Sequence, residues 1–339
     1  MVKGDYFKLK ICILVAALIL LFFASFLIGR YPIALKTTVD IILSSFTNIE
    51  QYWDQTLATV VLEVRLPRIV LAILVGGALS VSGASYQTMF KNPMVSPDIL
   101  GVSAGAGFGA ALAMINNANW IEIQGMAFFF GVIAVTAAYL ISSIFAGHSI
   151  TVLVLAGVVV GAFFQALLSI VKTLADTDNE LPSITFWLMG SLNRGTNQDV
   201  LIFLPVLILS MLVLFIFRHQ IDALAAGEDE AQTMGVNVTR LKLTVIACST
   251  LMTVSSVSIC GIIGWIGMVV PHLARMITGA NYSKIIALSF LIGGLFLLGI
   301  DNLIRGMNAI ELPLGVLTAL VGTPVFVVLL SRIKKGWNS

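Results

Sequence analysis

Residues 264–277 read GWIGMVVPHLARMI, and the direction of every later segment of the chain depends on them. The stretch is apolar but short, and Pro271, His272 and Arg275 interrupt it. A proline removes a backbone donor, and charged side chains are costly inside a bilayer. Hydropathy alone therefore does not tell whether these residues cross a membrane, and the rest of the chain has to be considered first.

The composition of the whole chain indicates a membrane protein. Of its 339 residues, 58% are hydrophobic and only 11% are charged, whereas soluble domains have about 25% charged residues. Because so apolar a chain lacks the polar surface of a soluble globule, we expect it to lie in a lipid bilayer. A net charge of +2 does not favour a nucleic-acid partner. The three cysteines lie in apolar runs without metal or disulfide spacing, so we expect no metal site and no cofactor.

Nine other stretches are apolar and long enough to span a membrane as helices. They cover residues 11–28, 69–89, 99–115, 125–145, 150–171, 200–217, 243–263, 285–304 and 312–331. The first is long for a signal peptide and lacks a small-residue cleavage site before Arg30, which favours an uncleaved helix. Dense small residues, as in Gly101–Gly109, favour close helix packing rather than nucleotide binding. The sequence thus predicts a single all-α, polytopic membrane domain over residues 1–339.

The distribution of lysine and arginine decides between nine and ten crossings, because cytoplasmic flanks are enriched in these residues. With a cytoplasmic N-terminus and a crossing at 264–277, twelve fall inside, namely Lys3, Lys8, Lys10, Lys91, Arg218, Arg240, Lys242, Arg275, Lys284, Arg332, Lys334 and Lys335. Seven fall outside, namely Arg30, Lys36, Arg65, Arg68, Lys172, Arg194 and Arg305. Without that crossing the split becomes 8 inside and 11 outside. We therefore predict ten transmembrane helices with both termini in the cytoplasm.

The predicted spans lack the groups that would power transport or catalyse a reaction. Their cores carry almost no ionisable residues, and Asp301 lies near a helix end, whereas ion-driven transporters use such residues as relays. No GxxxxGK[ST] motif is present to bind ATP. An enzyme is disfavoured because His148, His219 and His272 are scattered along the chain. What remains is a passive channel or secondary transporter, or a transport subunit that another protein powers.

The longest predicted cytoplasmic loop, residues 218–242, has the pattern of two short helices, over about Asp222–Ala226 and Glu228–Met234. The three acids at the start of the second helix suit the positive end of its dipole. Gly235 suits the left-handed residue that follows a helix. Small or apolar contact points are Ala225, Ala226, Ala231 and Met234. On physical grounds alone the loop is either a contact element or a solvated acidic segment.

Nine short motifs, spread in order over Leu57–Leu330, give the chain a resemblance to a known family. They are Arg65–Arg68 (RLPR), Gly83–Gln87, Asn92–Pro93, Pro97–Gly101, Leu155–Gly157, Trp187–Ser191, Gly264–His272, Glu311–Gly315 and Gly322–Phe326. Together with the acidic loop they resemble the FecCD family, the permeases of type II ABC importers for siderophores, haem and cobalamin. Each motif alone is weak, but the ordered set is specific.

The resemblance implies a non-catalytic permease subunit of the cytoplasmic (inner) membrane. Family members form homodimers or pair with a close homologue, and the solute passes along the twofold axis. Two ATPase subunits dock on one side and a periplasmic or lipid-anchored binding protein docks on the other. Chelated iron, as a siderophore complex, is the expected cargo because it is the family's commonest one. Haem, cobalamin and molybdate-type oxyanions remain alternatives.

The resemblance also assigns cytoplasmic site residues. In the family, the element matching loop 218–242 docks in a groove of the ATPase. The coupling residues implied are Ala226, Gly227, Glu228, Asp229, Glu230, Ala231, Met234 and Gly235. The loop between the fourth and fifth spans resembles the family's cytoplasmic gate, at His148, Ser149 and Thr151. The alternative for this segment is an ordinary loop before a helix.

Two further assignments concern the outer face. Residues 182–192 resemble the short periplasmic helix of the family's vestibule, with Trp187 and Met189 as lining residues. Interfacial anchoring is the alternative for both side chains. In the family, three arginines meet glutamates on the two lobes of the binding protein, and the matching residues here are Arg65, Arg68 and Arg305. Snorkelling to lipid phosphates is the alternative for these arginines.

Overall fold

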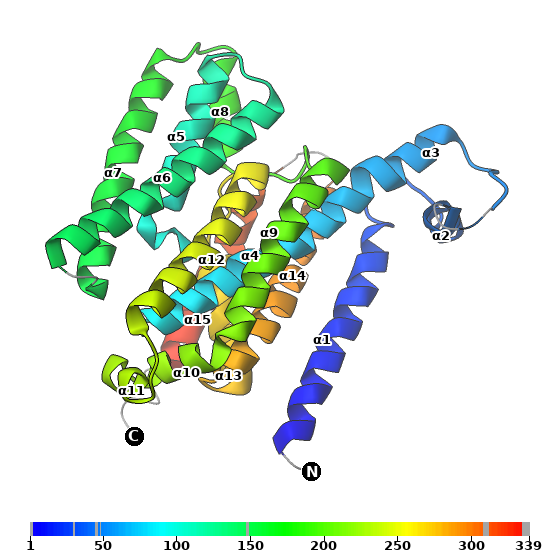
Figure 1. The fold of residues 1–339 in the computed structure, drawn as a ribbon. Coiled ribbons are helices and arrows are strands. Elements are labelled where there is room, and N and C mark those ends of the chain that lie inside the picture. Colours follow the sequence, from blue (N-terminus) through cyan, green and yellow to red (C-terminus); the bar gives the residue numbers. More distant parts are fainter. Residues whose placement is uncertain are drawn as a thin grey trace.

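The structure is a computed structural model, and it describes residues 3–29, 31–44, 47, 49–146, 149–307 and 312–333. Within these residues every regular element is a helix and no strand is present. The helices run side by side through a bundle, and a separate arm made by α2 (Leu35–Ser44) and α3 (Gln55–Thr59) projects from one end (Figure 1). The all-α fold predicted from the sequence is confirmed.

All ten predicted spans coincide with helices in the described part of the chain. These are α1 (Lys3–Ser25), α4 (Leu66–Met89), α5 (Val102–Ile115), α6 (Trp120–Ala146), α7 (Ile150–Leu174), α9 (Asn197–Ile216), α12 (Val238–Cys260), α13 (Ile266–Thr278), α14 (Tyr282–Gly306) and α15 (Leu314–Ile333). By length and composition α1, α6, α7, α9, α12 and α14 can cross a membrane, and α5, α13 and α15 are shorter apolar helices. Several of these helices, such as α1 and α9, begin before the predicted apolar run, because the polar residues that precede the run are helical as well.

The remaining elements are short. Before α4 the chain makes a π-helical turn over Val60–Arg65, and before α5 a 3₁₀ turn over Pro97–Leu100. The others are α8 (Glu180–Leu188), α10 (Arg218–Ala226) and α11 (Glu228–Thr233). The loop 218–242 therefore folds into two helices, as predicted, although the first begins four residues earlier than expected.

Small residues set the packing of the central helix α4. A Cβ atom built on Gly76 would lie 2.3 Å from the backbone oxygen of Gly293 on α14, and one on Gly83 would lie 1.8 Å from that of Gly267 on α13. Real side chains cannot occupy such space, so these backbones approach each other only because glycine stands at the contact. The predicted role of the small residues in helix packing is confirmed at these two crossings.

The segment between α12 and α14 returns through the bundle as an extended stretch followed by a short helix. Helix α12 ends at Cys260, residues 261–265 are not helical, and α13 then has only 13 residues. The far end of α13 meets the beginning of α1, where Lys10 Nζ donates to the backbone oxygen of Ile277 at 3.0 Å. An extended chain rises about 3.3 Å per residue against 1.5 Å in a helix. Few residues therefore suffice for this passage, which explains why the stretch is too short for a full helix.

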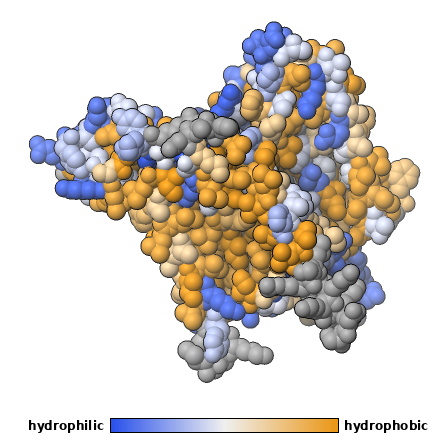
Figure 2. Space-filling view, turned by 180° about the vertical axis from the view of Figure 1, so that it is seen from behind, coloured by the Kyte–Doolittle hydropathy of each residue, from blue (hydrophilic) through white to orange (hydrophobic). Residues whose placement is uncertain are grey.

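Helices α10 and α11 lie at the same end of the bundle as the beginning of α1 (Figure 1). The opposite end carries α8 and the α2–α3 arm. Figure 2 shows that hydrophobic side chains cover a broad band of the surface between these ends, while hydrophilic residues gather at the extremities. Exposed apolar side chains of the bundle helices include Leu20 on α1 at 72% and Leu201 on α9 at 70% exposure. Such a band is what a bilayer would cover.

Candidate transport vestibule and coupling loop

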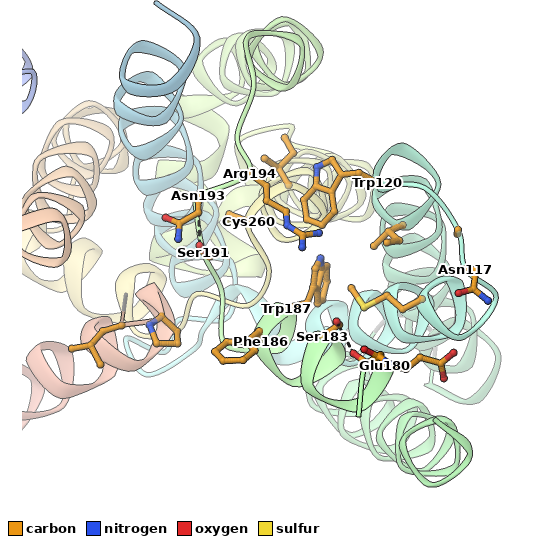
Figure 3. Close-up of a pocket in the computed structure, with 17 residues that line it drawn as sticks. Asn117, Trp120, Glu180, Ser183, Phe186, Trp187, Ser191, Asn193, Arg194 and Cys260 are labelled. Atoms are coloured by element: carbon orange, nitrogen blue, oxygen red, sulfur yellow. Dashed lines mark hydrogen bonds between the residues drawn. The ribbon is translucent and has the colours of Figure 1, made fainter. Parts of the chain in front are cut away.

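A cavity of about 780 Å³ opens at the end of the bundle that carries α8. Its walls come from the end of α5, the start of α6, α8, the loop after α8, the end of α12 and the start of α15 (Figure 3). The polar and aromatic residues of its wall are Asn117, Trp120, Asn179, Glu180, Ser183, Phe186, Trp187, Ser191, Asn193 and Arg194. Four separate stretches of the sequence, 114–123, 179–194, 259–260 and 312–313, thus build one concave site.

Of the two predicted vestibule residues, Trp187 lines this cavity and Met189 does not. Trp187 is 7% exposed, and its Nε1 is buried without a hydrogen-bond partner among the described residues. The Met189 side chain is 38% exposed, and its backbone oxygen accepts a hydrogen bond from the Gly315 N–H at 3.0 Å. The Ser191 N–H likewise donates to the Cys260 oxygen at 2.7 Å. These backbone bonds fix the end of α8 against α12 and α15.

Two other residues of the cavity wall were not singled out from the sequence. The guanidinium Cζ of Arg194 lies 4.9 Å from the centroid of the Trp120 ring, a distance typical of a cation–π contact. In the sequence analysis Arg194 contributed only to the charge count. The two residues are far apart in the chain, and no spacing rule connects them, so the pair emerges only from the fold.

Two of the three predicted docking arginines, Arg68 and Arg305, contact a buried carboxylate. Asp301 on α14 has no exposed surface, and its Oδ1 lies 2.8 Å from both Nε and Nη2 of Arg68. Its Oδ2 lies 2.9 Å from Nε of Arg305, which stands one turn further along the same helix. The sequence showed Asp301 near a helix end but gave no indication that it would be the centre of this cluster.

Arg65 and Arg305 hold the end of α1. Arg65 is 5% exposed and donates to the backbone oxygens of Phe26 and Tyr31. Arg305 Nη1 donates to the oxygens of Ser25 at 3.0 Å and Ile28 at 3.1 Å. The last carbonyls of a helix have no partner within it, and here the guanidinium groups supply the missing donors. Docking of a binding protein by these arginines stays a prediction, but their guanidinium groups already have partners inside the chain.

The coupling loop presents some of its predicted residues and buries others. Ala226, Asp229, Glu230, Met234 and Gly235 are exposed, with Met234 at 72%. Gly227 and Ala231 are buried within the chain, and Glu228 forms an ion pair with Lys242 at 2.7 Å. The exposed set therefore forms the surface of this loop that another protein can reach.

Two details match what the sequence predicts for this loop. The three acids at positions 228–230 occupy the first turn of α11, and Gly235 has a φ of +79°, which favours glycine. A third detail is new. Asp222 on α10 accepts hydrogen bonds from the Tyr282 N–H at 2.6 Å and from the Ser283 hydroxyl at 2.8 Å. The loop is thereby tied to the first turn of α14.

The predicted cytoplasmic gate is described only in part. His148 lies outside the described residues. Ser149 precedes α7 in an extended conformation, and its backbone oxygen accepts from the Ser142 hydroxyl at 3.3 Å. Thr151 stands exposed on the first turn of α7. The structure thus places Ser149 and Thr151 at a helix start, and the gate role stays a prediction.

Comparison with known families gives one match that covers nearly the whole chain. The model of the FecCD transport family matches residues 17–332. A molybdate import system permease protein, MolB of Haemophilus influenzae, is 35% identical over 91% of this chain and 91% of its own length. A probable iron chelatin transport system permease protein of Helicobacter pylori strain 26695 is 36% identical over 95% of this chain and 96% of its own length.

A solved structure shares the fold. It is described as an inward-facing conformation of an ABC transporter assigned to the metal-chelate type. It is 33% identical in sequence and has a TM-score of 0.86. The match covers 96% of this chain and 99% of the solved chain. The likeness therefore includes the cavity-bearing end and the coupling loop as well as the central helices.

Proposed function

The chain belongs to the FecCD transport family, and on this premise we propose that it carries an iron chelate through the inner membrane as the permease subunit of an ABC importer. It would be the non-catalytic part of that machine. A separate ATPase supplies the energy, and a binding protein delivers the cargo. The proposal places α10, α11 and both termini in the cytoplasm and the cavity beside α8 on the outer side.

The observation that carries the proposal is the coupling loop. Helices α10 and α11 present an exposed methionine and acids at the end of the bundle opposite the cavity, and Asp222 links this loop to α14. A passive channel needs no such element. An importer needs one, because a movement of the ATPase has to reach the helices that bound the pathway.

The proposed partners follow from the same arrangement. We expect two ATPase subunits below two copies of this chain, with the pathway between the copies, and one binding protein above them. A homodimer is the simplest assembly, and a pair with a homologous permease is the alternative. The lipid bilayer surrounds the hydrophobic band of Figure 2.

The iron chelate is the finer part of the proposal. The relatives named for molybdate and for iron chelatin are 35% and 36% identical to this chain, so identity alone favours neither cargo. An aromatic wall and a volume of about 780 Å³ suit an organic chelate, since pockets for such ligands enclose roughly 300–1,000 Å³. A small oxyanion would leave most of this space to water. Haem and cobalamin remain the alternatives of similar or larger size.

The test is reconstitution with the partners. The binding protein is copurified, its bound ligand is identified, and that ligand is offered to liposomes that contain the chain and its ATPase. Uptake is expected only with ATP and the binding protein. If the purified chain alone passes the solute at full rate without ATP, the protein is a channel and the proposal is wrong.

A further inference from the structure

The cavity beside α8 contains hydrogen-bond donors that lack acceptors. The indole N–H groups of Trp120 and Trp187 are both buried and have no partner among the described residues. Burying a donor without a partner costs free energy, so native proteins pair such groups with protein, water or ligand. Both tryptophans line the cavity, so an acceptor that enters it, with a small shift of the indole rings, would satisfy these donors.

Arg194 adds a positive charge at the same place. Its guanidinium stacks over the Trp120 ring, and it forms no ion pair with a carboxylate in the part of the chain that the structure describes. Figure 3 shows the nitrogen-bearing edge of Trp187 directed toward this guanidinium. A guanidinium and an indole N–H are both donors. Neither can satisfy the other, and an acceptor between them would serve both.

The cavity wall also carries a carboxylate. Glu180 is the carboxylate among the described lining residues, and its Oε2 accepts a hydrogen bond from the Asp176 N–H at 2.9 Å. The amides of Asn117 and Asn179 can act as donors as well as acceptors. The donors Arg194, Trp120 and Trp187 lie together on one side of the cavity, away from Glu180, so this side suits a ligand that carries oxygen acceptors and negative charge.

We propose that this cavity binds the carboxylate or oxyanion oxygens of an anionic chelate. Arg194 would hold a carboxylate through its two parallel N–H groups, a geometry that guanidinium favours. The Trp187 N–H would donate to a neighbouring oxygen, and the indole and phenyl rings of the wall would cover the organic part. The inference rests on the proposed transport function, because it specifies the charge of the cargo at the outer vestibule. The binding is weak, since a transported solute must leave again.

The experiment measures binding to the purified chain in lipid nanodiscs, without ATPase or binding protein. Equilibrium dialysis uses radiolabelled ferric citrate as the anionic probe and a neutral ferric hydroxamate of similar size. Arg194→Gln should weaken ferric citrate binding about tenfold and leave the neutral chelate unchanged. Trp187→Phe keeps a ring but removes the N–H, and should weaken ferric citrate binding about threefold. Arg218→Gln is the matched control, because Arg218 also stacks on a ring, that of Phe215 at 3.9 Å, but at the other end of the bundle.

Three results would overturn the inference. The first is unchanged ferric citrate binding by Arg194→Gln. The second is neutral hydroxamate binding as tight as that of ferric citrate. The third is no binding of either free chelate to the unmodified chain, and the carboxylate for this site would then come from the binding protein. Failure of the proposed function looks different, because it would appear as absent ATP-dependent uptake in complete liposomes while the dialysis results still stand.

Discussion

Asp301 on α14 and Arg68 on α4 form a buried ion pair in which two nitrogens of the guanidinium lie 2.8 Å from one carboxylate oxygen. The Asp301 side chain is 0% exposed and that of Arg68 is 13% exposed. Arg305 approaches the second oxygen at 2.9 Å. One carboxylate thus contacts two cations, and one of them, Arg305, in turn helps to hold the end of α1 against the bundle.

Replacing Asp301 with alanine should therefore destabilise the protein strongly. Removing one partner of a buried ion pair leaves an uncompensated charge and typically costs about 3–5 kcal/mol. Thermal unfolding of the purified protein should shift to lower temperature, and proteolysis between α1 and α2 should become faster. Asp178→Ala is the control, because Asp178 is exposed at the same end of the bundle. Equal unfolding temperatures for the two variants would show that the pair contributes nothing.

The docking prediction has to be tested against this structural role. Reversing Arg65 and Arg68 to glutamate would set new carboxylates beside Asp301 and beside the backbone oxygens that Arg65 now binds. We expect the double reversal to lower stability as well as affinity for the binding protein. Asp301→Ala disturbs the same cluster without reversing the charge of the arginines. If docking depends on these arginines, the double reversal loses more affinity at low salt than Asp301→Ala does; equal losses would exclude docking through them.

Much of the fold could be predicted because helices that lie in an apolar environment appear as continuous apolar runs in the sequence. Runs of about 20 apolar residues mark helices wherever they occur. The choice of ten crossings over nine, which rests on charge asymmetry, stays a prediction. The non-helical residues 261–265 could not be predicted in this way. They are as apolar as a helix, but Gly261 and Trp265 both have a φ of +71°, which a right-handed helix does not allow.

Site residues could be predicted only where they follow a pattern of neighbouring residues in the sequence. The acids of α11 and Gly235 follow rules for helix ends, and both were found in the sequence. Asp301 and the Arg194–Trp120 pair depend on contacts between segments that lie far apart in the chain. The ion-pair partner of Asp301 could not be predicted from hydropathy. Arg68 belongs to a different helix, and only the packing of α4 on α14 brings the two residues together.

Gly235 offers a test that separates backbone conformation from side-chain bulk. Its φ is +79°, and a Cβ atom there would meet nothing within 4 Å. Asparagine tolerates this left-handed region, whereas β-branched valine does not. We expect Gly235→Val to reduce ATP-dependent uptake strongly by distorting the loop, and Gly235→Asn to retain most of it. Transport assays in liposomes with the ATPase present measure this, and equal loss in both variants would mean that the space itself is needed for docking.

Asp222 is expected to transmit movement between the coupling loop and α14. Asp222→Ala removes acceptors from the Tyr282 N–H and the Ser283 hydroxyl, a loss comparable to that of a helix cap, about 1 kcal/mol. The amount of solute taken up per ATP hydrolysed should fall several-fold, which is more than the loss of folded protein would cause. Asn281→Ala is the matched control, because it removes the other cap of α14, on the Lys284 N–H at 3.1 Å, without touching α10. Equal uptake per ATP in both variants would argue against a coupling role.

The orientation of the chain in the membrane can be tested with single cysteines. Cys12 is exposed whereas Cys248 and Cys260 are buried, so Cys12→Ser gives a suitable background. Because α10 is bonded to the start of α14, Met234→Cys and Lys284→Cys lie at one end of the bundle, and Thr177→Cys lies at the other, next to α8. An impermeant thiol reagent added to intact cells should label only Thr177→Cys, and lysis should expose the other two. A cysteine at Ser339 should behave like Lys284→Cys if both termini are cytoplasmic. Labelling of Lys284→Cys from outside would mean that residues 261–278 do not return through the membrane, and the ten-helix topology would be wrong.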